Sequence, residues 1–395
     1  MVRLGDLFDF KNGRSFKKSE WKSSGLPIIR IQNLNDISAA FNYFQSEYDK
    51  AIEVNSGDLL FSWSGTVGSS FGPHIWEREQ GVLNQHIFKL NFKTDMVTKY
   101  AYFALLFITT EIERSVVGAV GLVHVTKKSL NEYKIPAPSV DEQKRIVAIL
   151  DQAFADIDKA RALTEQNLKN ARELFESYLQ QVFNRRGEGW TDKYLHEFCT
   201  FSSGGTPSKE NDTYWEGNIP WISGRDMKST QLSDSLLHIT QAAVDESSTR
   251  MAQVGAILVL VRGMGLAHGA QVAELLAPSA FNQDIKGLHP ESGIVPRFLV
   301  FALRHQINSS ENVLSNAAHG TLKIDMDALK NLVIALPTEE QQKEIVAQCN
   351  LLIEQRDQLE LIYKTKLESL DNLKKSLLQK AFSGELTKRC NEVAA

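Results

Sequence analysis

Cysteine is scarce in this sequence, and the few cysteines show no pattern. The 395 residues include Cys199, Cys349 and Cys390, which form no Cys-x-x-Cys pair and no cluster with histidine. A disulfide framework and a zinc site are therefore not indicated.

Long apolar runs are also missing. No stretch reaches the roughly 18 apolar residues that a membrane-spanning helix requires. The opening segment MVRLGDLFDF contains acids early and lacks the basic-then-apolar order of a secretory signal. We therefore expect a cytoplasmic protein without a membrane segment.

An excess of positive charge is absent as well. The 44 Lys and Arg are outnumbered by 48 Asp and Glu, which gives a formal net charge of −4. This balance argues against a protein that coats nucleic acid without sequence preference, but cations clustered on one face would still permit specific binding. Residues 1–140 are slightly basic and residues 186–338 are acidic. If both halves bind DNA, the second has to concentrate its few cations locally or use those of a partner.

Several catalytic signatures are missing from the chain. It contains no GxxxxGK(S/T) phosphate loop, no GxSxG elbow, no HExxH helix and no Asn/Asp-Pro-Pro-aromatic motif of amino-methyltransferases. The run Arg262–Gly269 (RGMGLAHG) resembles a nucleotide-binding glycine loop, but its G-x-G-x-x-x-G spacing favours an ordinary loop. The acid-x-Lys triplet Glu132–Lys134 lacks the nearby upstream acid of a nuclease site. We therefore expect no catalytic residue and no metal site, which favours a binding or scaffolding component.

The sequence contains an internal repeat. Four pairs of similar segments occur in the same order, and they align Leu4 with Leu195, Pro27 with Pro220, Asn84 with Asn282 and Pro138 with Pro337. The offset between the copies increases along the chain, which indicates small insertions in the second copy rather than the chance similarity of one motif. A repeat of this length predicts two similar structural units.

The first part of each copy, 1–138 and 188–337, is rich in glycine, serine, asparagine and aromatic residues. Short β-like runs (PIIRIQ, DLLFSW and HIFKL in copy one, IPWIS and AILVLV in copy two) are bounded by turns such as SGTVGSSFG. Helical stretches at Thr98–Arg114 and Pro296–Gln306 interrupt these runs. The mixture predicts two similar α+β domains with mixed sheets.

The second part of each copy, 139–187 and 338–383, has almost no glycine or proline and predicts one long helix, followed by a C-terminal tail at 384–395. Each helix begins with Ser or Thr after a proline, and acids and Gln follow, which is typical of a helix start. Apolar residues then recur at heptad-like spacing; in the second copy they include Ile345, Cys349, Leu352, Leu359, Ile362, Leu370, Leu373 and Leu377.

These stripes predict that the two long helices pair with each other. Their length and their scarcity of helix breakers favour an antiparallel coiled coil, with the two domains related by a pseudo-two-fold axis. The alternative is a pair of ordinary amphipathic helices, each packed on its own domain.

Three groups of residues carry a resemblance to a known family. The first is SSGGTPSK (Ser202–Lys209) with YWEGNIPWIS (Tyr214–Ser223), and the second is GDLLFSWSGTVG (Gly57–Gly68) with NQHIF, echoed by GAILVLVRGMG with NQDI. The third is the boundary phrase IPAPSVDEQKRIVAILD, repeated as IALPTEEQQKEIVAQCN. Over essentially its whole length, the chain resembles the specificity (S) subunit of Type I DNA restriction-modification systems.

The resemblance implies a non-catalytic subunit that recognises DNA. Each globular domain would recognise one half of a bipartite target in duplex DNA, and the helical rod would set the spacer and dock two methyltransferase (modification) subunits. Restriction/translocase subunits would join this complex. No cofactor is implied for this chain, since S-adenosylmethionine, ATP and Mg²⁺ are expected on the partner subunits. The alternative is a protein-binding scaffold with paired domains on a coiled-coil rod, whereas the missing motifs disfavour a self-contained DNA-modifying enzyme.

Candidate DNA-contacting residues are basic or polar side chains in loops that the copies do not share, because the two domains would recognise different sequences. They are Arg14, Lys17, Lys18 and Trp63 in the first copy and Arg225, Arg262 and His268 in the second, with Lys127, Lys128 and Lys323 as phosphate contacts before the helices. A solvated surface residue is the alternative for each. The repeated Asn-Gln pairs at Asn84 and Asn282 are more often structural, because both copies contain them.

Overall fold

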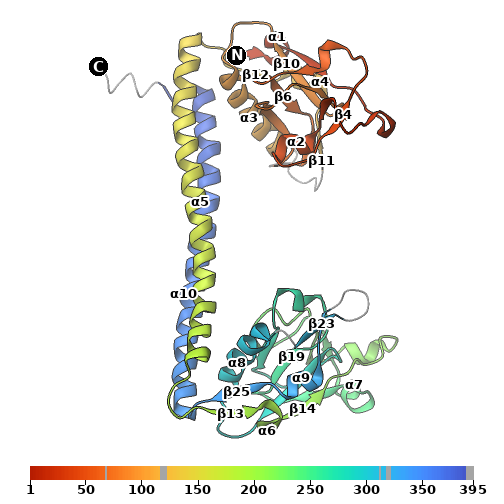
Figure 1. Ribbon diagram of the computed structural model, residues 1–395, viewed down its shortest axis with the longest axis vertical. Helices are drawn as coiled ribbons and strands as arrows, with labels where there is room; N and C mark the ends of the chain where they lie inside the picture. The colour runs from red at the N-terminus through yellow and green to blue at the C-terminus, as the bar shows by residue number, and fades with distance from the viewer. Residues whose placement is uncertain (67–68, 116–121, 311–312, 317–321, 388–395) are drawn as a thin grey trace, which may run out of the picture. The chain divides into compact units, whose positions relative to one another are not determined.

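The chain divides into two compact units, each of which holds one globular part. The computed structural model describes residues 1–66, 69–115, 122–310, 313–316 and 322–387. One unit comprises Met1–Gln166 and the segment from Tyr363 onward, and the other comprises Asn167–Ile362. Each also contains a stretch of each of two long helices (Figure 1). Residues 67–68 of the expected turn, Cys390 and most of the expected tail lie outside the described residues.

The globular part of the first unit is built on two four-stranded sheets. One has the order β2 (Phe8–Asn12), β10 (Ile87–Phe92), β6 (Leu59–Ser62) and β8 (Gly72–Ile75), with antiparallel pairs. The other has the order β4 (Asn42–Phe44), β3 (Leu26–Ile29), β9 (Gly81–Leu83) and β5 (Glu53–Val54), in which β3 and β9 are parallel. Helix α3 (Thr98–Ser115) packs against β8. The smaller elements are β1 (Val2–Arg3), α1 (Leu4–Leu7), η1 (Lys18–Glu20), α2 (Ile31–Asn35), η2 (Lys50–Ile52), β7 (Ser64–Thr66), β11 (Leu122–His124), α4 (Lys127–Glu132) and β12 (Lys134–Ile135).

The globular part of the second unit repeats this strand order. Its larger sheet runs β14 (Cys199–Ser203), β22 (Ile285–Pro290), β19 (Ile257–Leu260), β20 (Val272–Leu275) and β16 (Gln231–Leu232). Its smaller sheet runs β17 (His238–Ile239), β15 (Ile219–Ile222), β21 (Ser279–Phe281) and β18 (Arg250–Ala252), with β15 and β21 parallel. Helix α8 (Pro296–Ser309) packs against β19 and β20. The smaller elements are β13 (Thr191–Tyr194), α6 (Leu195–Phe198), η3 (Asp212–Trp215), α7 (Gln241–Glu246), η4 (Met264–His268), β23 (Leu314–Asn316), β24 (Leu322–Ile324), α9 (Met326–Lys330) and β25 (Val333–Leu336).

The matching strand orders, which include the same parallel pair in the smaller sheets, confirm the internal repeat and the α+β class. Most of the expected runs fall on strands, but the run PIIRIQ is wrong in its second half. There β3 ends at Ile29 and helix α2 begins at Ile31. The side chain of Asn33 accepts a hydrogen bond from the backbone N–H of Arg30 at 3.1 Å, which stabilises a helix start instead of a strand.

A repeated glycine follows the first strand of each larger sheet. A Cβ atom at Gly13 would lie 2.2 Å from the carbonyl oxygen of Asn84, and one at Gly204 would lie 2.2 Å from that of Phe281. Any side chain at either position would collide with backbone, so only glycine permits this close approach. The two glycines thus place equivalent strand ends against the Asn-Gln turns of both copies.

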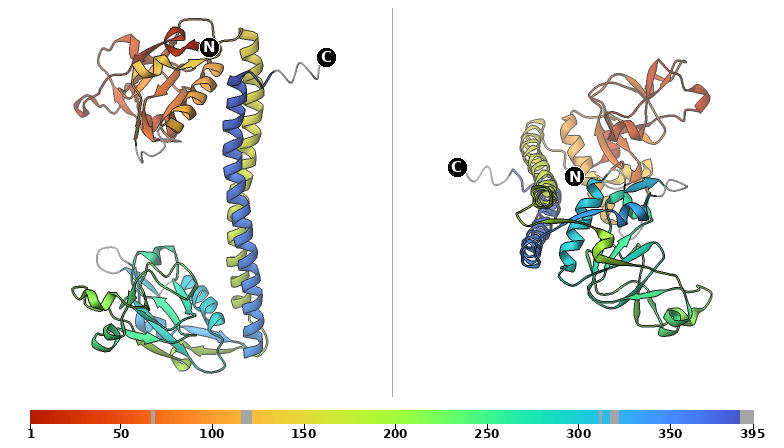
Figure 2. Two further views of the ribbon diagram at one scale, coloured as in Figure 1. Left: turned by 180° about the vertical axis from the view of Figure 1, so that it is seen from behind. Right: turned by 60° about the horizontal axis from the view of Figure 1, so that its bottom comes forward.

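The two long helices, α5 (Val140–Arg185) and α10 (Glu339–Ser383), run side by side within each unit (Figures 1 and 2). Four buried residues of α5 recur every seven positions, which is the period of a coiled-coil seam. They are Leu150, Ile157, Thr164 and Ala171.

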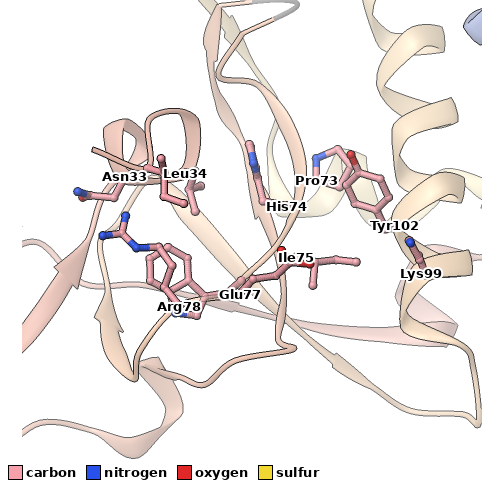
Figure 3. A pocket seen from close by; sticks show the side chains of 11 residues that line it. Asn33, Leu34, Pro73, His74, Ile75, Glu77, Arg78, Lys99 and Tyr102 are labelled. Carbon is pink, nitrogen blue, oxygen red and sulfur yellow. The ribbon is translucent and has the colours of Figure 1, made fainter. Parts of the chain in front are cut away.

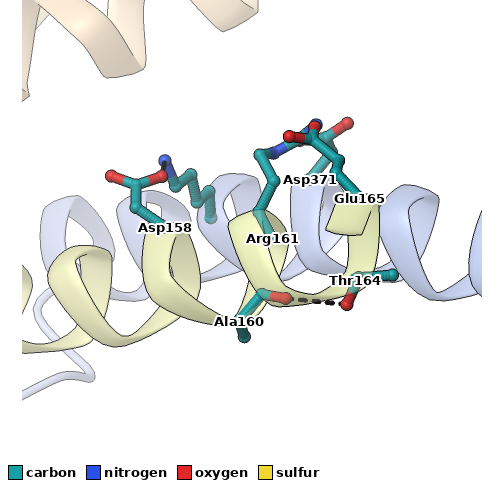
Figure 4. Close-up of polar contacts among 7 residues, drawn as sticks. Asp158, Ala160, Arg161, Thr164, Glu165 and Asp371 are labelled. Carbon is teal, nitrogen blue, oxygen red and sulfur yellow. Dashed lines mark hydrogen bonds and ion pairs between the residues drawn. The ribbon is translucent and has the colours of Figure 1, made fainter. Parts of the chain in front are cut away.

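Ion pairs between α5 and α10 define their direction in the first unit. Asp158 pairs with Lys374, and Arg161 pairs with Asp371 (Figure 4). Residue numbers therefore rise along α5 while they fall along α10, which confirms that the helices are antiparallel.

The second unit has a matching ion pair. Arg172 of α5 donates two hydrogen bonds to the carboxylate of Glu360 of α10, at 2.9 and 3.2 Å. In both units the arginine comes from α5 and the carboxylate from α10, so these charges favour contact between the two different helices.

The expected apolar stripe of the second helix is only partly correct. Leu359, Ile362 and Leu373 are exposed, at 36%, 58% and 46%, whereas Leu378 is buried. The apolar residues of α10 cover more of its circumference than α5 can bury, because a two-helix seam is narrow. Heptad-like spacing alone therefore does not predict which apolar residues of α10 lie in the seam and which are exposed.

A buried glutamine connects each globular part to the start of its long helix. The amide oxygen of Gln143 accepts the backbone N–H of Val97 at 2.9 Å, and its amide nitrogen donates to the Pro138 carbonyl at 2.9 Å. Gln342 makes the same two bonds, with Val295 at 2.8 Å and with Pro337 at 3.0 Å. These contacts give the repeated Pro-acid-Gln phrase a structural role, since Val97 and Val295 immediately precede α3 and α8.

We predict that Gln143→Ala or Gln342→Ala lowers the unfolding free energy by about 1–3 kcal/mol, because each leaves buried backbone polar groups without partners. Thermal unfolding of the full chain measures the effect. The exposed Gln152 of α5 provides the control, and Gln152→Ala should change the midpoint little. Equal midpoints for all three variants would contradict the assigned role.

Candidate nucleic-acid interface

A cavity of about 270 Å³ lies in the second unit at the ends of three strands. It is lined by residues that follow β15, β19 and β21. Because β15 and β21 are parallel, they end at the same edge, where the N–H of Asn282 donates to the carbonyl of Ile222 at 3.0 Å. Loops placed by a rigid sheet are common binding sites.

Two of the predicted DNA-contacting residues meet at this cavity. Arg225 and Arg262 both line it and both are exposed, and neither guanidinium has a hydrogen-bond or ion-pair partner in the part of the chain that the structure describes. A tight turn presents Arg225, since the carboxylate of Asp226 accepts from the N–H and the hydroxyl of Ser223 at 2.8 and 2.7 Å. Unpaired arginines can bind guanine edges or phosphates.

The other two candidates of the second unit lie near Arg262. Lys323 of β24 is its neighbour through an antiparallel backbone bridge. His268 is exposed at the end of η4, on the same loop, but it does not line the cavity.

The loop RGMGLAHG does not have the geometry of a nucleotide-binding glycine loop. Gly263 has a φ of 144°, which a side chain would disfavour, and a short 3-10 helix, Met264–His268, follows it. A dinucleotide site requires an α-helix whose N-terminus faces the phosphates. The segment instead forms one wall of the cavity.

An equivalent depression occurs in the first unit. A cavity of about 160 Å³ is lined by Arg30, Ile31 and Gln32 after β3 and by Asn84 and His86 after β9. These positions correspond to Ser223–Arg225, Asn282 and Asp284 of the other cavity. Arg30, Gln32 and His86 were not among the residues predicted to contact DNA, because all three belong to runs that were expected to be strands, PIIRIQ and HIFKL.

Several polar atoms beside this depression are buried without a partner. Among the described residues, Nδ1 of His86, which lines the depression, Oε1 of the adjacent Gln85 and Nε1 of Trp21 make no hydrogen bond, and neither does Nη1 of Arg78 at another cavity. Buried polar groups are rarely left unpaired, and exceptions concentrate where a ligand or water completes the site. These atoms therefore support a binding role for the strand-end cavity of the first unit.

Two first-unit candidates are engaged in internal contacts. The guanidinium of Arg14 donates to Glu20 at 2.6 Å and lies 4.2 Å from the ring centroid of Phe16. The indole N–H of Trp63 donates to the Gln85 carbonyl at 3.1 Å. Both side chains thus stabilise the domain, and DNA would have to compete with existing partners.

The remaining first-unit candidates are lysines. The ammonium of Lys127 donates to the Phe10 carbonyl at 2.5 Å and lies 3.6 Å from Asp9. Lys17, Lys18 and Lys128 are exposed, and their ammonium groups have no ion-pair partner among the residues that the structure describes. Of the first-unit candidates, Lys17, Lys18 and Lys128 are therefore the cations most available to phosphates.

The repeated Asn-Gln pairs have equivalent backbone contacts. The N–H of Asn84 donates to the Ile29 carbonyl at 3.0 Å, as that of Asn282 does to Ile222. These matching bonds support a structural role for the two asparagine positions, and the differing side chains around them are the better source of specificity.

A larger cavity of about 410 Å³ lies elsewhere in the first unit (Figure 3). Arg78 and Leu34 lie on one side of it and Tyr102 of α3 on the other, with His74 between them. Burial lowers the pKa of His74 to about 4, so this imidazole is neutral near pH 7. A neutral, half-buried histidine is consistent with packing.

The described part of the chain shows no cluster suited to metal chemistry or thiol chemistry. Within it, no group of three or more His, Cys, Asp or Glu side chains could hold a metal ion. Burial raises the pKa of Cys199 and of Cys349 to about 12, far from that of a reactive thiolate. None of the described helices combines the length and the apolar character needed to cross a membrane.

We predict that His74 makes the chain less stable as the pH falls from about 6.5 to about 4, because the unfolded histidine takes up a proton that the folded one excludes. The contribution of the neutral His74 to the free energy of unfolding is fully present above pH 6.5 and is lost as the pH falls toward about 4. The His74→Phe variant should lose less in its unfolding midpoint between pH 7 and pH 5 than the wild type. Identical losses of the two proteins would contradict a neutral, half-buried imidazole at position 74.

Comparison with known proteins gives a family. The model of the Type I restriction modification DNA specificity domain matches the chain twice, over residues 1–167 and 187–370. The EcoR124I/EcoR124II specificity subunit of Escherichia coli is 32% identical over 226 residues, which are 55% of this chain and 54% of that one, so the match spans about half of each. The EcoBI specificity subunit of Escherichia coli is 24% identical over 98% of this chain and 86% of that one.

Solved structures share the fold. A chain from a study of complex assembly and conformational transition of the type I R-M system has a TM-score of 0.77 at 20% identity, covering 98% of this chain and 97% of that one. The HsdS subunit from Thermoanaerobacter tengcongensis has a TM-score of 0.58 at 18% identity, covering 98% and 96%. Together with the family model, which matches both copies of the repeat, these findings confirm the resemblance, and the chain belongs to the family of Type I restriction-modification specificity subunits.

Proposed function

We propose that this chain recognises a bipartite sequence in duplex DNA, with one half-site for each globular part. The observation that carries the proposal is the pair of strand-end cavities. They occupy the same place in two copies of one fold, but Arg30, Gln32 and His86 line one, whereas Arg225 and Arg262 line the other. The same backbone frame with different hydrogen-bonding side chains suits two different base sequences.

The charge distribution supports this proposal. The second globular part is acidic overall, yet Arg225 and Arg262 line its cavity, and Lys323 is joined to Arg262 by a backbone bridge. A few local cations suit specific contacts more than general coating of DNA, and binding should weaken as salt concentration rises.

The paired helices are proposed to set the spacer between half-sites and to dock two methyltransferase subunits. Exposed apolar side chains on α10, such as Leu351, Leu361 and Ile362, support a protein contact on this surface. In this proposal the chain acts in the cytoplasm without a cofactor of its own. S-adenosylmethionine binds the modification subunits, and restriction/translocase subunits that use ATP and Mg²⁺ complete the assembly.

We predict that Arg262→Gln and Arg225→Gln each weaken recognition of one half-site, by about 1–3 kcal/mol for a lost base contact. The measurement is binding of the subunit with its methyltransferase to duplexes in which one half-site at a time is scrambled. The control is Lys193→Gln, because Lys193 is exposed and is not among the residues that line the cavity. Equal affinity for target and scrambled duplex would instead favour a protein-binding scaffold.

A second prediction concerns the spacer. Removing seven residues from each helix, 162–168 and 364–370, keeps the heptad period and shortens the pair by about 10 Å, or roughly three base pairs. Both segments lie between the two arginine-carboxylate pairs. Methylation at the original spacing should be lost, and any that remains should join the same half-sites by a shorter spacer. Unchanged methylation would refute a ruler made by these helices.

A further inference from the structure

A second cavity in the second unit, of about 450 Å³, carries an unusual concentration of positive charge. It lies where α8 meets α5 and α10, and we refer to it as the α8 cavity. Its cationic side chains are Arg297 and Arg304 of α8, Arg356 of α10 and Lys228 from the turn before β16. Asp357 is the single carboxylate among its described lining residues.

The hydrogen-bond partners of Arg297 are neutral groups, although the carboxylate of Glu274 also favours its positive charge. It is 8% exposed, and its guanidinium donates to the carbonyl and the hydroxyl of Thr230, both at 2.9 Å. Arg297 and Arg304 are seven positions apart, so they share a face of α8 with Phe301 between them. This face therefore presents two positive charges to the cavity without a carboxylate on α8 itself.

The two long helices supply only partial neutralisation. Arg356 pairs with Asp357 at 2.7 Å and lies over the ring of Phe175 at 5.5 Å. Arg304 has no hydrogen bond or ion pair among the described residues. Burial lowers the pKa of Arg304. The carboxylate of Glu176 opposes this lowering, and the positive charge of Arg356 adds to it. An incompletely paired, partly buried guanidinium is costly and favours an added anion.

The first unit shows that the contact between domain and helices does not need this excess charge. The matching bonds of Val97 and Val295 align α3 with α8, so Leu106 stands where the second copy has Arg304. Ile157 likewise stands in place of Arg356. Lys99, the counterpart of Arg297, is neutralised by Asp151 at 2.7 Å. The same packing is thus achieved with balanced charge.

We propose that the α8 cavity binds a small oxyanion of the phosphate class, either inorganic phosphate or diphosphate. Arginine offers a planar set of donors that matches phosphate oxygens, and Lys228 adds a point charge. A bound anion would link α8, α10 and the turn before β16. It would therefore strengthen the attachment of the second globular part to the helices, independently of the DNA recognition proposed above.

Calorimetric titration of the full chain with sodium diphosphate and with sodium phosphate, at fixed ionic strength, tests this site. Wild-type protein should show one saturable site for at least one of the two anions. Arg304→Leu, which introduces the residue of the first copy, should weaken binding by roughly tenfold or more, as expected for a lost charged hydrogen bond. Arg185→Leu, an exposed position of α5 outside the cavity, should bind as the wild type does.

A charge-preserving variant separates recognition from folding. Arg304→Lys keeps the charge but loses the planar pair of donors, so it should fold and bind more weakly than the wild type. If Arg304→Leu does not fold, the anion affinity of Arg304→Lys provides the test instead. Absence of saturable binding by the wild type, or equal binding by wild type and Arg304→Lys, would overturn the proposal.

Discussion

The buried glutamine at the start of each long helix is the contact on which the arrangement of each unit depends. Gln143 and Gln342 each join a helix start, the carbonyl of the preceding proline and the residue before a domain helix. Both ends of the amide are used, and both side chains are shielded from water, so loss of either bond leaves an unpaired polar group. The hydrogen bonds of this glutamine therefore help to orient each globular part on the long helices, and apolar packing stabilises the same contact.

The two copies share this backbone arrangement and differ mainly in the side chains that line their strand-end cavities. Gly13 and Gly204 permit the same close backbone approach, and Asn84 and Asn282 form the same backbone bonds. Apart from these asparagines, the side chains that line the strand-end cavities differ, and one set includes Arg225 and Arg262, which are unpaired among the residues that the structure describes. A duplicated frame with differing linings is what two unlike half-sites require. The charge excess of the α8 cavity is a second difference, at the contact with the helices rather than at the loops.

Sequence predicted the features that repeat or have a strong period: the duplication, the long helices that follow Pro138 and Pro337, and most strands. It could not predict which basic side chains are already paired, because the partners of Arg14 and Lys127 are brought close only by folding. The cavity residues around Arg30 were missed because an apolar run concealed a helix start set by a single asparagine. Likewise, the exposed leucines of α10 have seam-like spacing, and only the position of α5 shows that they lie outside the seam.

The most direct test is to map methylated adenines in DNA from cells that carry this chain with its methyltransferase partner. Two similar domains with different linings predict one asymmetric motif, composed of two unlike half-sites that are separated by a fixed stretch of unspecified bases. The Arg262→Gln variant should relax one half-site and leave the other unchanged. A single continuous motif, a palindrome, or methylation that does not depend on this chain would contradict the account.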